Sequence, residues 1–153
     1  MMQNFIFRYT ILLLTFICSF ELRCMEKELK QEPYGTQGEV LKRLSVGPNS
    51  YRVVIFDSKG LEESEVAYFY LPHVYAHINF VWTREQSRRR GLARFLLLQT
   101  CDHLSSLECE RISLSVLKDN EPAISLYKQC GFVKKPADFR ESSLDNYEKK
   151  LTK

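Results

Sequence analysis

Two segments of the chain carry residues that can do chemistry. The first is Arg88-Arg89-Arg90-Gly91-Leu92-Ala93, a basic run that leads into a helical pattern through small residues. The second runs from Asn120 to Tyr127 with the sequence NEPAISLY and is followed by Gly131-Phe132. The first segment has the composition of an anion-binding turn. The second places a phenol at a fixed position on a helix.

The basic turn suits a phosphate because of what a helix start offers. The N–H groups of the first helical turn have no partner within the helix, and they attract anions together with the helix dipole. Gly91 and Ala93 let an anion approach these groups closely, and the arginines can add charge-assisted hydrogen bonds. Two other readings stay open for an isolated basic run: a solvated loop that caps the helix, or a nucleic-acid patch.

The phenol of Tyr127 can serve as a proton donor. Tyr127 lies seven residues after Asn120, which is two helical turns along the same face. A phenol with a reference pKa of ~10 can donate a proton or a hydrogen bond to a leaving group. The alternative is an ordinary core tyrosine whose hydroxyl finds a partner.

Together the two segments resemble the GNAT superfamily of acyl-CoA-dependent N-acetyltransferases. Arg88-x-x-Gly91-x-Ala93 is similar to the family's Q/R-x-x-G-x-G/A turn, and the second segment is similar to its N-x-x-A-x-x-x-Y motif with a terminal G-F. The resemblance covers about residues 51–151. It implies direct transfer of an acetyl group from acetyl-CoA to a primary amine, with no metal. The cofactor contacts it implies are Arg88, Arg89, Arg90, Gly91, Leu92, Ala93, Arg94 and Asn120.

The strand before the turn is expected to carry the base. In the family this strand splays from its parallel neighbour and binds the pantetheine arm, a role that falls here to the backbone of Val81, Trp82 and Thr83. His77 is the candidate base, because its unperturbed pKa of ~6.5 suits removal of a proton from an ammonium group. The alternative for His77 is a partly buried histidine bonded to a backbone carbonyl. Glu85 and His73 are further candidates for the base.

Hydrophobic periodicity predicts the elements that hold these residues. Alternation in Tyr75 to Thr83 places Tyr75, His77, Asn79 and Val81 on one face and Ala76, Ile78, Phe80 and Trp82 on the other. The 3, 4, 7, 8 spacing of Ala93, Leu96, Leu97, Cys101 and Leu104 predicts a helix. Asn120 is expected to cap a second helix with Pro122 in its first turn and Gly131 at its end. Strands are expected at 51–56, 65–71, 75–83, 111–116, 132–135 and 146–151.

This order predicts an α/β (α+β) fold. The sheet is mixed, mostly antiparallel and twisted, with a splayed central strand pair and flanking helices, which is also the order of the GNAT fold. Residues 51–153 are expected to form the acetyltransferase domain. Residues 25–50 read as a polar linker with one short helix at Glu39–Leu44. Residues 1–24 read as an apolar leader, a buried N-terminal element, or an extension upstream of translation from Met25.

Composition limits the other classes of function. The 153 residues suit one domain, and a net charge of +3 gives no general argument for nucleic acid. The five cysteines show no C-x-x-C spacing, and Cys101 and Cys130 are expected to be buried packing residues. The need for acyl-CoA favours the cytoplasm, with export or membrane anchoring through residues 5–22 as the alternative. Peptide N-termini and small amines are the candidate acceptors, whereas the oligomeric state has no signature.

A reading of a different class also remains. The chain would then be a non-catalytic acyl-CoA-binding module, or a basic module that meets nucleic acid or lipid, on the same fold.

Overall fold

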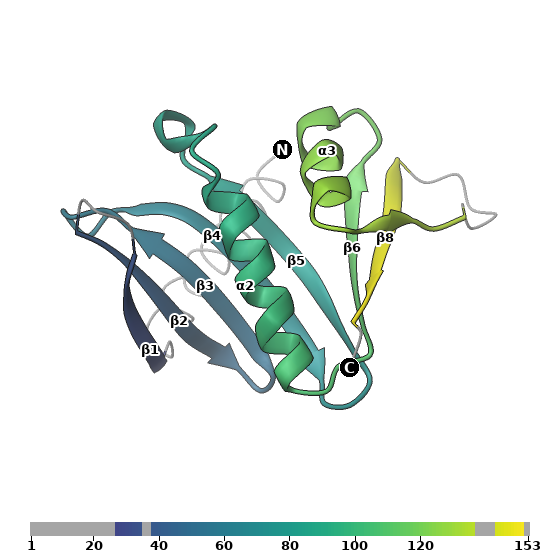
Figure 1. The fold of residues 1–153 in the computed structure, drawn as a ribbon, viewed down its shortest axis with the longest axis horizontal. Coiled ribbons are helices and arrows are strands. Elements are labelled where there is room, and N and C mark those ends of the chain that lie inside the picture. The colour runs from purple at the N-terminus through teal and green to yellow at the C-terminus, as the bar shows by residue number, and fades with distance from the viewer. Residues whose placement is uncertain (1–26, 35–37, 137–142, 152–153) are drawn as a thin grey trace, which may run out of the picture.

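The computed structural model describes residues 27–34, 38–136 and 143–151, and these form a mixed sheet with helices (Figure 1). The strand order in the described part is β1-β2-β3-β4-β5-β6-β8-β7, and all neighbours are antiparallel except β5 and β6. The strands are β1 (Lys27–Tyr34), β2 (Glu39–Gly47), β3 (Ser50–Phe56), β4 (Glu62–Leu71), β5 (Tyr75–Thr83), β6 (Arg111–Leu117), β7 (Val133–Lys134) and β8 (Leu144–Lys150). The helices are η1 (Glu85–Ser87), α2 (Leu92–Ser106) and α3 (Glu121–Gln129). The expected fold class and element order from residue 51 onward are confirmed.

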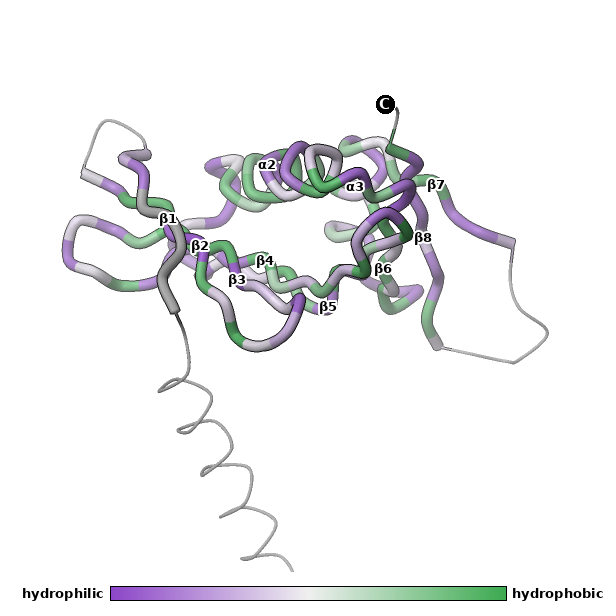
Figure 2. The backbone as a smooth tube through the Cα atoms, turned by 90° about the horizontal axis from the view of Figure 1, so that it is seen from below, coloured by the Kyte–Doolittle hydropathy of each residue, from purple (hydrophilic) through white to green (hydrophobic). Residues whose placement is uncertain are grey.

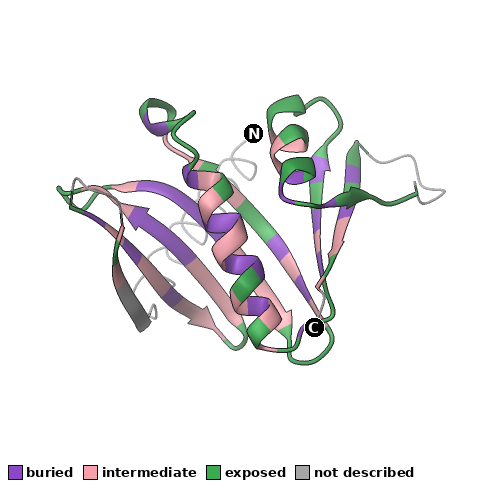
Figure 3. Cartoon of the chain, viewed as in Figure 1, coloured by how far each residue is buried: buried purple, intermediate pink, exposed green. Residues whose placement is uncertain are grey.

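Helices α2 and α3 cover the same face of the sheet, and the main core lies between them and the strands (Figure 2). The apolar stripe of α2 supplies Leu96, Leu97 and Leu104, which are fully buried. Ala76 and Ile78 of β5 face this layer, as do Ile112, Leu114 and Val116 of β6. The buried positions follow α2 and the strands beneath it in Figure 3. Cys101 and Cys130 are buried in the same core and are not joined in a disulfide.

The parallel pair β5 and β6 separates partway along its length. Their pairing runs from Tyr75 opposite Arg111 to Ile78 opposite Leu114 and goes no further. β5 nevertheless continues to Thr83 beside β4, with Thr83 opposite Ser64. The edge of β5 from Asn79 to Thr83 therefore has no strand partner on the β6 side among the described residues. Figure 1 shows the two strands diverging toward the start of α2.

A β-bulge at Asn79 corrects the predicted faces of β5. Ala67 of β4 pairs with Phe80 while the next residue, Tyr68, pairs with Ile78, so Asn79 is the extra residue. Beyond the bulge, Val81 packs against the core, whereas Phe80 and Trp82 are 49% and 36% exposed. The simple alternation of side chains fails here because an inserted residue reverses every later side chain.

The predicted helix at Glu39–Leu44 is wrong, since these residues belong to strand β2. Leu41 lies opposite Ile55 and joins the main core, while Leu44 lies opposite Arg52 on the other face. Both leucines are buried. Their three-residue spacing resembles a helical stripe but comes from two faces of a strand. The expected linker thus holds two strands of the sheet.

The apolar segment at residues 1–24 lies outside the described residues, so the three readings of it stay predictions. Within the described ranges, the structure has no helix with the length and apolar character needed to span a membrane.

Candidate active site

The basic turn connects the free edge of β5 to the first turn of α2. Arg89 and Gly91 have φ values of 64° and 81°, and α2 begins at Leu92. The first N–H to bond back within the helix is that of Phe95, which donates to the Gly91 carbonyl at 3.0 Å. Among the described residues, no backbone carbonyl accepts a hydrogen bond from the N–H groups of Leu92, Ala93 and Arg94. These three donors are what an anion would meet at the helix start.

The backbone of Gly91 leaves the space beside these donors open. A Cβ at this position would find no atom within 4 Å. A left-handed φ of 81° is easily adopted only by glycine, because other residues bring Cβ against the following carbonyl. The side chain of Leu92, the first residue of α2, is buried in the core.

We expect Gly91→Ala to weaken acetyl-CoA binding about tenfold, a change of about 1.4 kcal/mol. The added methyl occupies the space from which a phosphate would reach the helix. Gly60→Ala is the matched control, because Gly60 has φ 77° and no atom within 4 Å of its Cβ position. Each variant should lower the free energy of unfolding by about 1 to 2 kcal/mol. Urea unfolding measures this loss. Calorimetric titration should show weaker acetyl-CoA binding for Gly91→Ala only, and equal affinities would contradict this assignment.

The side chain of Arg90 is 40% exposed and is held by two carboxylates of the sheet, whereas its predicted contact with phosphate stays a prediction. Its guanidinium forms an ion pair with Glu63 at 2.6 Å, and another with Glu39 of β2. The side chains of both glutamates are only 8% exposed. Ser87 also donates to Glu63, at 2.8 Å. Arg90 therefore fastens the turn to β2 and β4 and is a positioning residue.

The remaining arginines of the turn are exposed. Arg88 donates from Nε to the Thr83 carbonyl at 3.3 Å, while Arg89 and Arg94 extend from the turn and the first helical turn. Because Arg90 is already paired, these three supply the positive charge that a bound anion would meet.

The free edge of β5 offers fewer backbone groups than the sequence suggests. The Trp82 carbonyl accepts a hydrogen bond at 2.9 Å from Ser64 of β4, so this group faces β4 and does not belong to the free edge. The Thr83 carbonyl accepts the bond from Arg88. Val81 and Asn79 lie where the strands have just separated. Val81 is thus the residue of this edge, just beyond the separation, at which the predicted contact with a pantetheine arm stays open.

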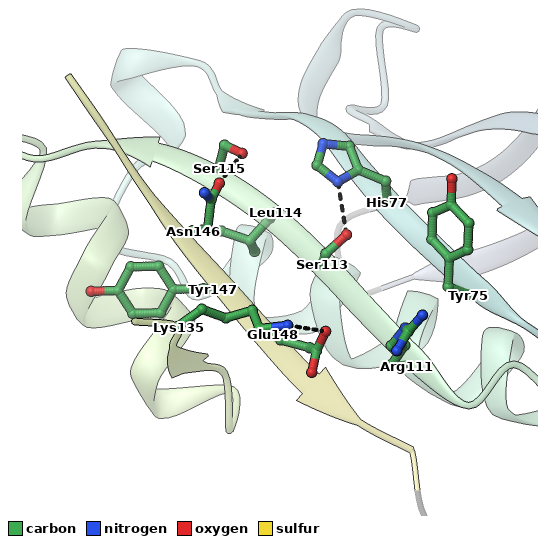
Figure 4. Close-up of a pocket in the computed structure, with 10 residues that line it drawn as sticks. All are labelled: Tyr75, His77, Arg111, Ser113, Leu114, Ser115, Lys135, Asn146, Tyr147 and Glu148. Carbon is green, nitrogen blue, oxygen red and sulfur yellow. Dashed lines mark hydrogen bonds and ion pairs between the residues drawn. The ribbon is translucent and has the colours of Figure 1, made fainter. Parts of the chain in front are cut away.

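His77 faces the side of the sheet opposite the helices and is held by Ser113. Its Nδ1 lies 2.9 Å from the Ser113 hydroxyl oxygen (Figure 4). That hydroxyl lies 3.4 Å from the Ala76 carbonyl. If the hydroxyl donates to the carbonyl, its oxygen accepts from Nδ1–H, and the lone pair of His77 is on Nε2. Burial lowers the pKa of His77 from its usual 6.5. This geometry favours a neutral imidazole with a free acceptor nitrogen.

A pocket of about 410 Å³ lies beside His77 on this open face. Polar side chains from β5, β6 and β8 dominate its lining, with Lys135 at one side (Figure 4). Its lining residues are Tyr75, His77, Arg111, Ser113, Leu114, Ser115, Lys135, Asn146, Tyr147 and Glu148. The pocket runs along β6 as far as Ser115, where β5 and β6 have already separated.

Asn120 and Tyr127 are placed by α3 on the other side of the sheet. The Asn120 side chain accepts from the Ala123 N–H at 3.3 Å, which confirms it as the helix cap. Tyr127 is 7% exposed and its ring packs edge-on against Phe132. Burial raises the pKa of Tyr127, and the nearby Cys130 adds to this. With the described residues the Tyr127 hydroxyl makes no hydrogen bond, so a protonated donor is available.

The other candidate bases lie elsewhere. His73 sits in the β4–β5 loop and pairs with Glu108 at 2.8 Å, and Glu85 begins η1. Neither residue lines the pocket. Sequence reasoning missed Ser113 and the pair of glutamates around Arg90. Ser113 could have been found, because it alternates with Ile112 and Leu114 and therefore faces the same side as His77.

Comparisons with known proteins show the family and the fold of the chain. The model of the acetyltransferase (GNAT) family matches residues 54–132, whereas no curated protein matches. A solved protein from Klebsiella pneumoniae described as an acyl-CoA N-acyltransferase superposes with a TM-score of 0.62 at 19% identity, covering 68% of this chain and 74% of that one. Spermidine N-acetyltransferase from Vibrio cholerae, solved with CoA and spermine, gives a TM-score of 0.56 at 20% identity, covering 67% and 66%. These structures share the fold, and the match to the family model over half of the sequence shows that the chain belongs to the GNAT family of N-acetyltransferases.

Proposed function

We propose that this chain transfers an acetyl group from acetyl-CoA directly to a primary amine, with His77 as general base and Tyr127 as general acid. One observation supports this above the others. The edge of β5 that is free of β6 ends in a turn with unpaired N–H groups, while the same strand presents His77 to a polar pocket. Cofactor and acceptor could thus approach the separated strands from opposite sides of the sheet.

The N–H groups of Leu92, Ala93 and Arg94 would bind the pyrophosphate, and exposed Arg88, Arg89 and Arg94 would add positive charge. The pantetheine arm would follow the edge of β5 at Val81. The Asn120 Oδ1 caps α3, and the Nδ2 donors of the same side chain would contact the cofactor at the start of that helix.

The chemistry removes one proton from the ammonium group before the attack, delivers one to the leaving sulfur, and removes a second from the nitrogen as the amide forms. His77 Nε2 takes a proton from the ammonium group, directly or through water, and the neutral amine attacks the thioester carbonyl to form a tetrahedral intermediate. The intermediate collapses with cleavage of the C–S bond. Tyr127 donates its proton to the leaving sulfur and recovers one from the amine nitrogen through solvent. No covalent enzyme intermediate is required.

His77→Gln should reduce kcat/KM most near pH 6.5 and less at higher pH. The pKa of His77 lies below 6.5, so in the wild type its base form is already abundant there. The variant depends on acceptor molecules whose amine is already neutral. The neutral fraction of the acceptor rises tenfold per pH unit up to the pKa of the amine. The ratio of wild-type to variant kcat/KM should therefore shrink by up to about tenfold per pH unit. A ratio that does not change with pH would indicate a structural role only.

The proposed function is tested by thermal unfolding with acetyl-CoA and by release of CoA thiol with a panel of primary amines. A ligand at 100 times its Kd should stabilise the protein by about 2.7 kcal/mol, and at least one amine should be acetylated. Stabilisation without any turnover would support a binding module. No stabilisation by acetyl-CoA, together with salt-sensitive binding of single-stranded nucleic acid, would contradict the enzyme reading.

A further inference from the structure

The pocket beside His77 carries an unmatched positive charge at the end where β5 and β6 are still paired. Its lining includes one carboxylate, that of Glu148, which already forms an ion pair with Lys135 at 3.1 Å (Figure 4). Arg111 is exposed and has no ion pair with any residue that the structure describes. Lys150 lies directly opposite Arg111 in the β6–β8 register and so on the same face of the sheet. This end of the pocket is therefore cationic.

The pocket also has a direction. Tyr75 and Arg111 pair at the end where β5 and β6 are still joined, which we call the closed end. His77 and Ser113 are the next pair on this face, and Ser115 lies where the strands have separated. Because a strand rises about 3.3 Å per residue, Arg111 and Ser113 are about 7 Å apart along β6. An acceptor whose amine lies near His77 would thus extend its other end toward Arg111. A pocket of about 410 Å³ is of the size that small ligands use.

We infer that the acceptor is a small primary amine that also carries an acidic group, a carboxylate or a phosphate, which Arg111 binds at the closed end of this pocket. The inference rests on the proposed function and adds the class of acceptor. Arg111 provides a planar set of donors that match either anion. A polyamine presents only positive charges, and this pocket has no free carboxylate among its described lining residues to receive them. The acceptor is thus expected to differ in charge from the spermidine that names the Vibrio cholerae enzyme.

Four primary amines of similar length, which differ in the group at their other end, show how the charge of that group affects turnover. These are 4-aminobutanoate, 3-aminopropyl phosphate, butylamine and 1,4-diaminobutane, each supplied with saturating acetyl-CoA. The wild-type protein should show a kcat/KM for the better of the two acid-bearing amines at least about tenfold above that for butylamine, as hydrogen bonds to charged groups provide. 1,4-Diaminobutane should be the poorest acceptor. Comparison of 4-aminobutanoate with 3-aminopropyl phosphate shows whether the pocket prefers a carboxylate or a phosphate.

Arg111→Gln should remove this preference by lowering kcat/KM for the acid-bearing amines toward the value for butylamine. The control is Lys59→Gln, an exposed cation in the β3–β4 turn outside the pocket, and it should leave all four values unchanged. An equal loss for all four amines in Arg111→Gln would overturn the inference, as would turnover of 1,4-diaminobutane at or above the rate of the acid-bearing amines.

A chemical-shift titration with the same amines measures their binding independently of acetyl transfer. Acid-bearing amines should perturb the amide signals of residues 111–115 in the wild type and much less in Arg111→Gln. Perturbation without acetylation of any amine would support the pocket and contradict the proposed function. Failure of both acid-bearing amines to perturb these signals would overturn the inference about the acceptor.

Discussion

Replacing Arg90 with glutamine should destabilise the protein by about 3 kcal/mol, because two nearly buried carboxylates would lose their common cation. The side chains of Glu39 and Glu63 are 8% exposed, whereas that of Arg90 is 40% exposed. The expected loss therefore lies at the low end of the range for a broken buried pair. Urea unfolding monitored by circular dichroism measures this loss.

Arg89→Gln is the matched control, since Arg89 is the neighbouring arginine and is exposed. It should change the free energy of unfolding by no more than about 0.5 kcal/mol. Changing both glutamates to glutamine together with Arg90 should recover much of the loss, because no unpaired charge then stays buried. A loss below about 0.5 kcal/mol for Arg90→Gln would contradict the positioning role of Arg90.

Tyr127→Phe should lower kcat by about 10²-fold or more, the range of general acid catalysis, and leave the affinity for acetyl-CoA within about twofold. The substitution removes only the hydroxyl, which has no internal partner among the described residues. The packing of the ring against Phe132 is retained. Steady-state rates of thiol release, combined with calorimetric titration of acetyl-CoA, separate the two effects.

Tyr68→Phe provides the comparison, because Tyr68 is a tyrosine of the same core that is 1% exposed and comes from β4. Its loss of a hydroxyl should leave kcat unchanged. If Tyr127→Phe retained kcat within twofold of the wild type, Tyr127 would be a packing residue only.

Local pattern was enough for most of the fold. The strand at Tyr75–Thr83 was predicted with its observed bounds, and Asn120 caps α3 as expected. These features depend on alternation, helical spacing and capping, which neighbouring residues determine. The separation of β5 from β6 was expected only from the family resemblance, because no local pattern encodes where two strands distant in sequence stop pairing.

The features that the sequence could not predict depend on residues that are distant in the chain. The bulge at Asn79 reverses the side chains of Phe80, Val81 and Trp82, and alternation within β5 gives no sign of it. The guanidinium of Arg90 is held because Glu39 and Glu63 come to it from two other strands. The charged residues of the pocket beside His77 come together only because β8 pairs with β6 in the sheet.

We propose that the N–H groups at the start of α2 bind the pyrophosphate of coenzyme A. A titration of isotope-labelled protein with coenzyme A, followed by amide chemical shifts, reports on each of these groups separately. The largest changes are predicted at Gly91, Leu92, Ala93 and Arg94, with smaller ones along β5 from Asn79 to Thr83. Saturating coenzyme A that leaves these amides unchanged, or that perturbs a different surface, would contradict the account.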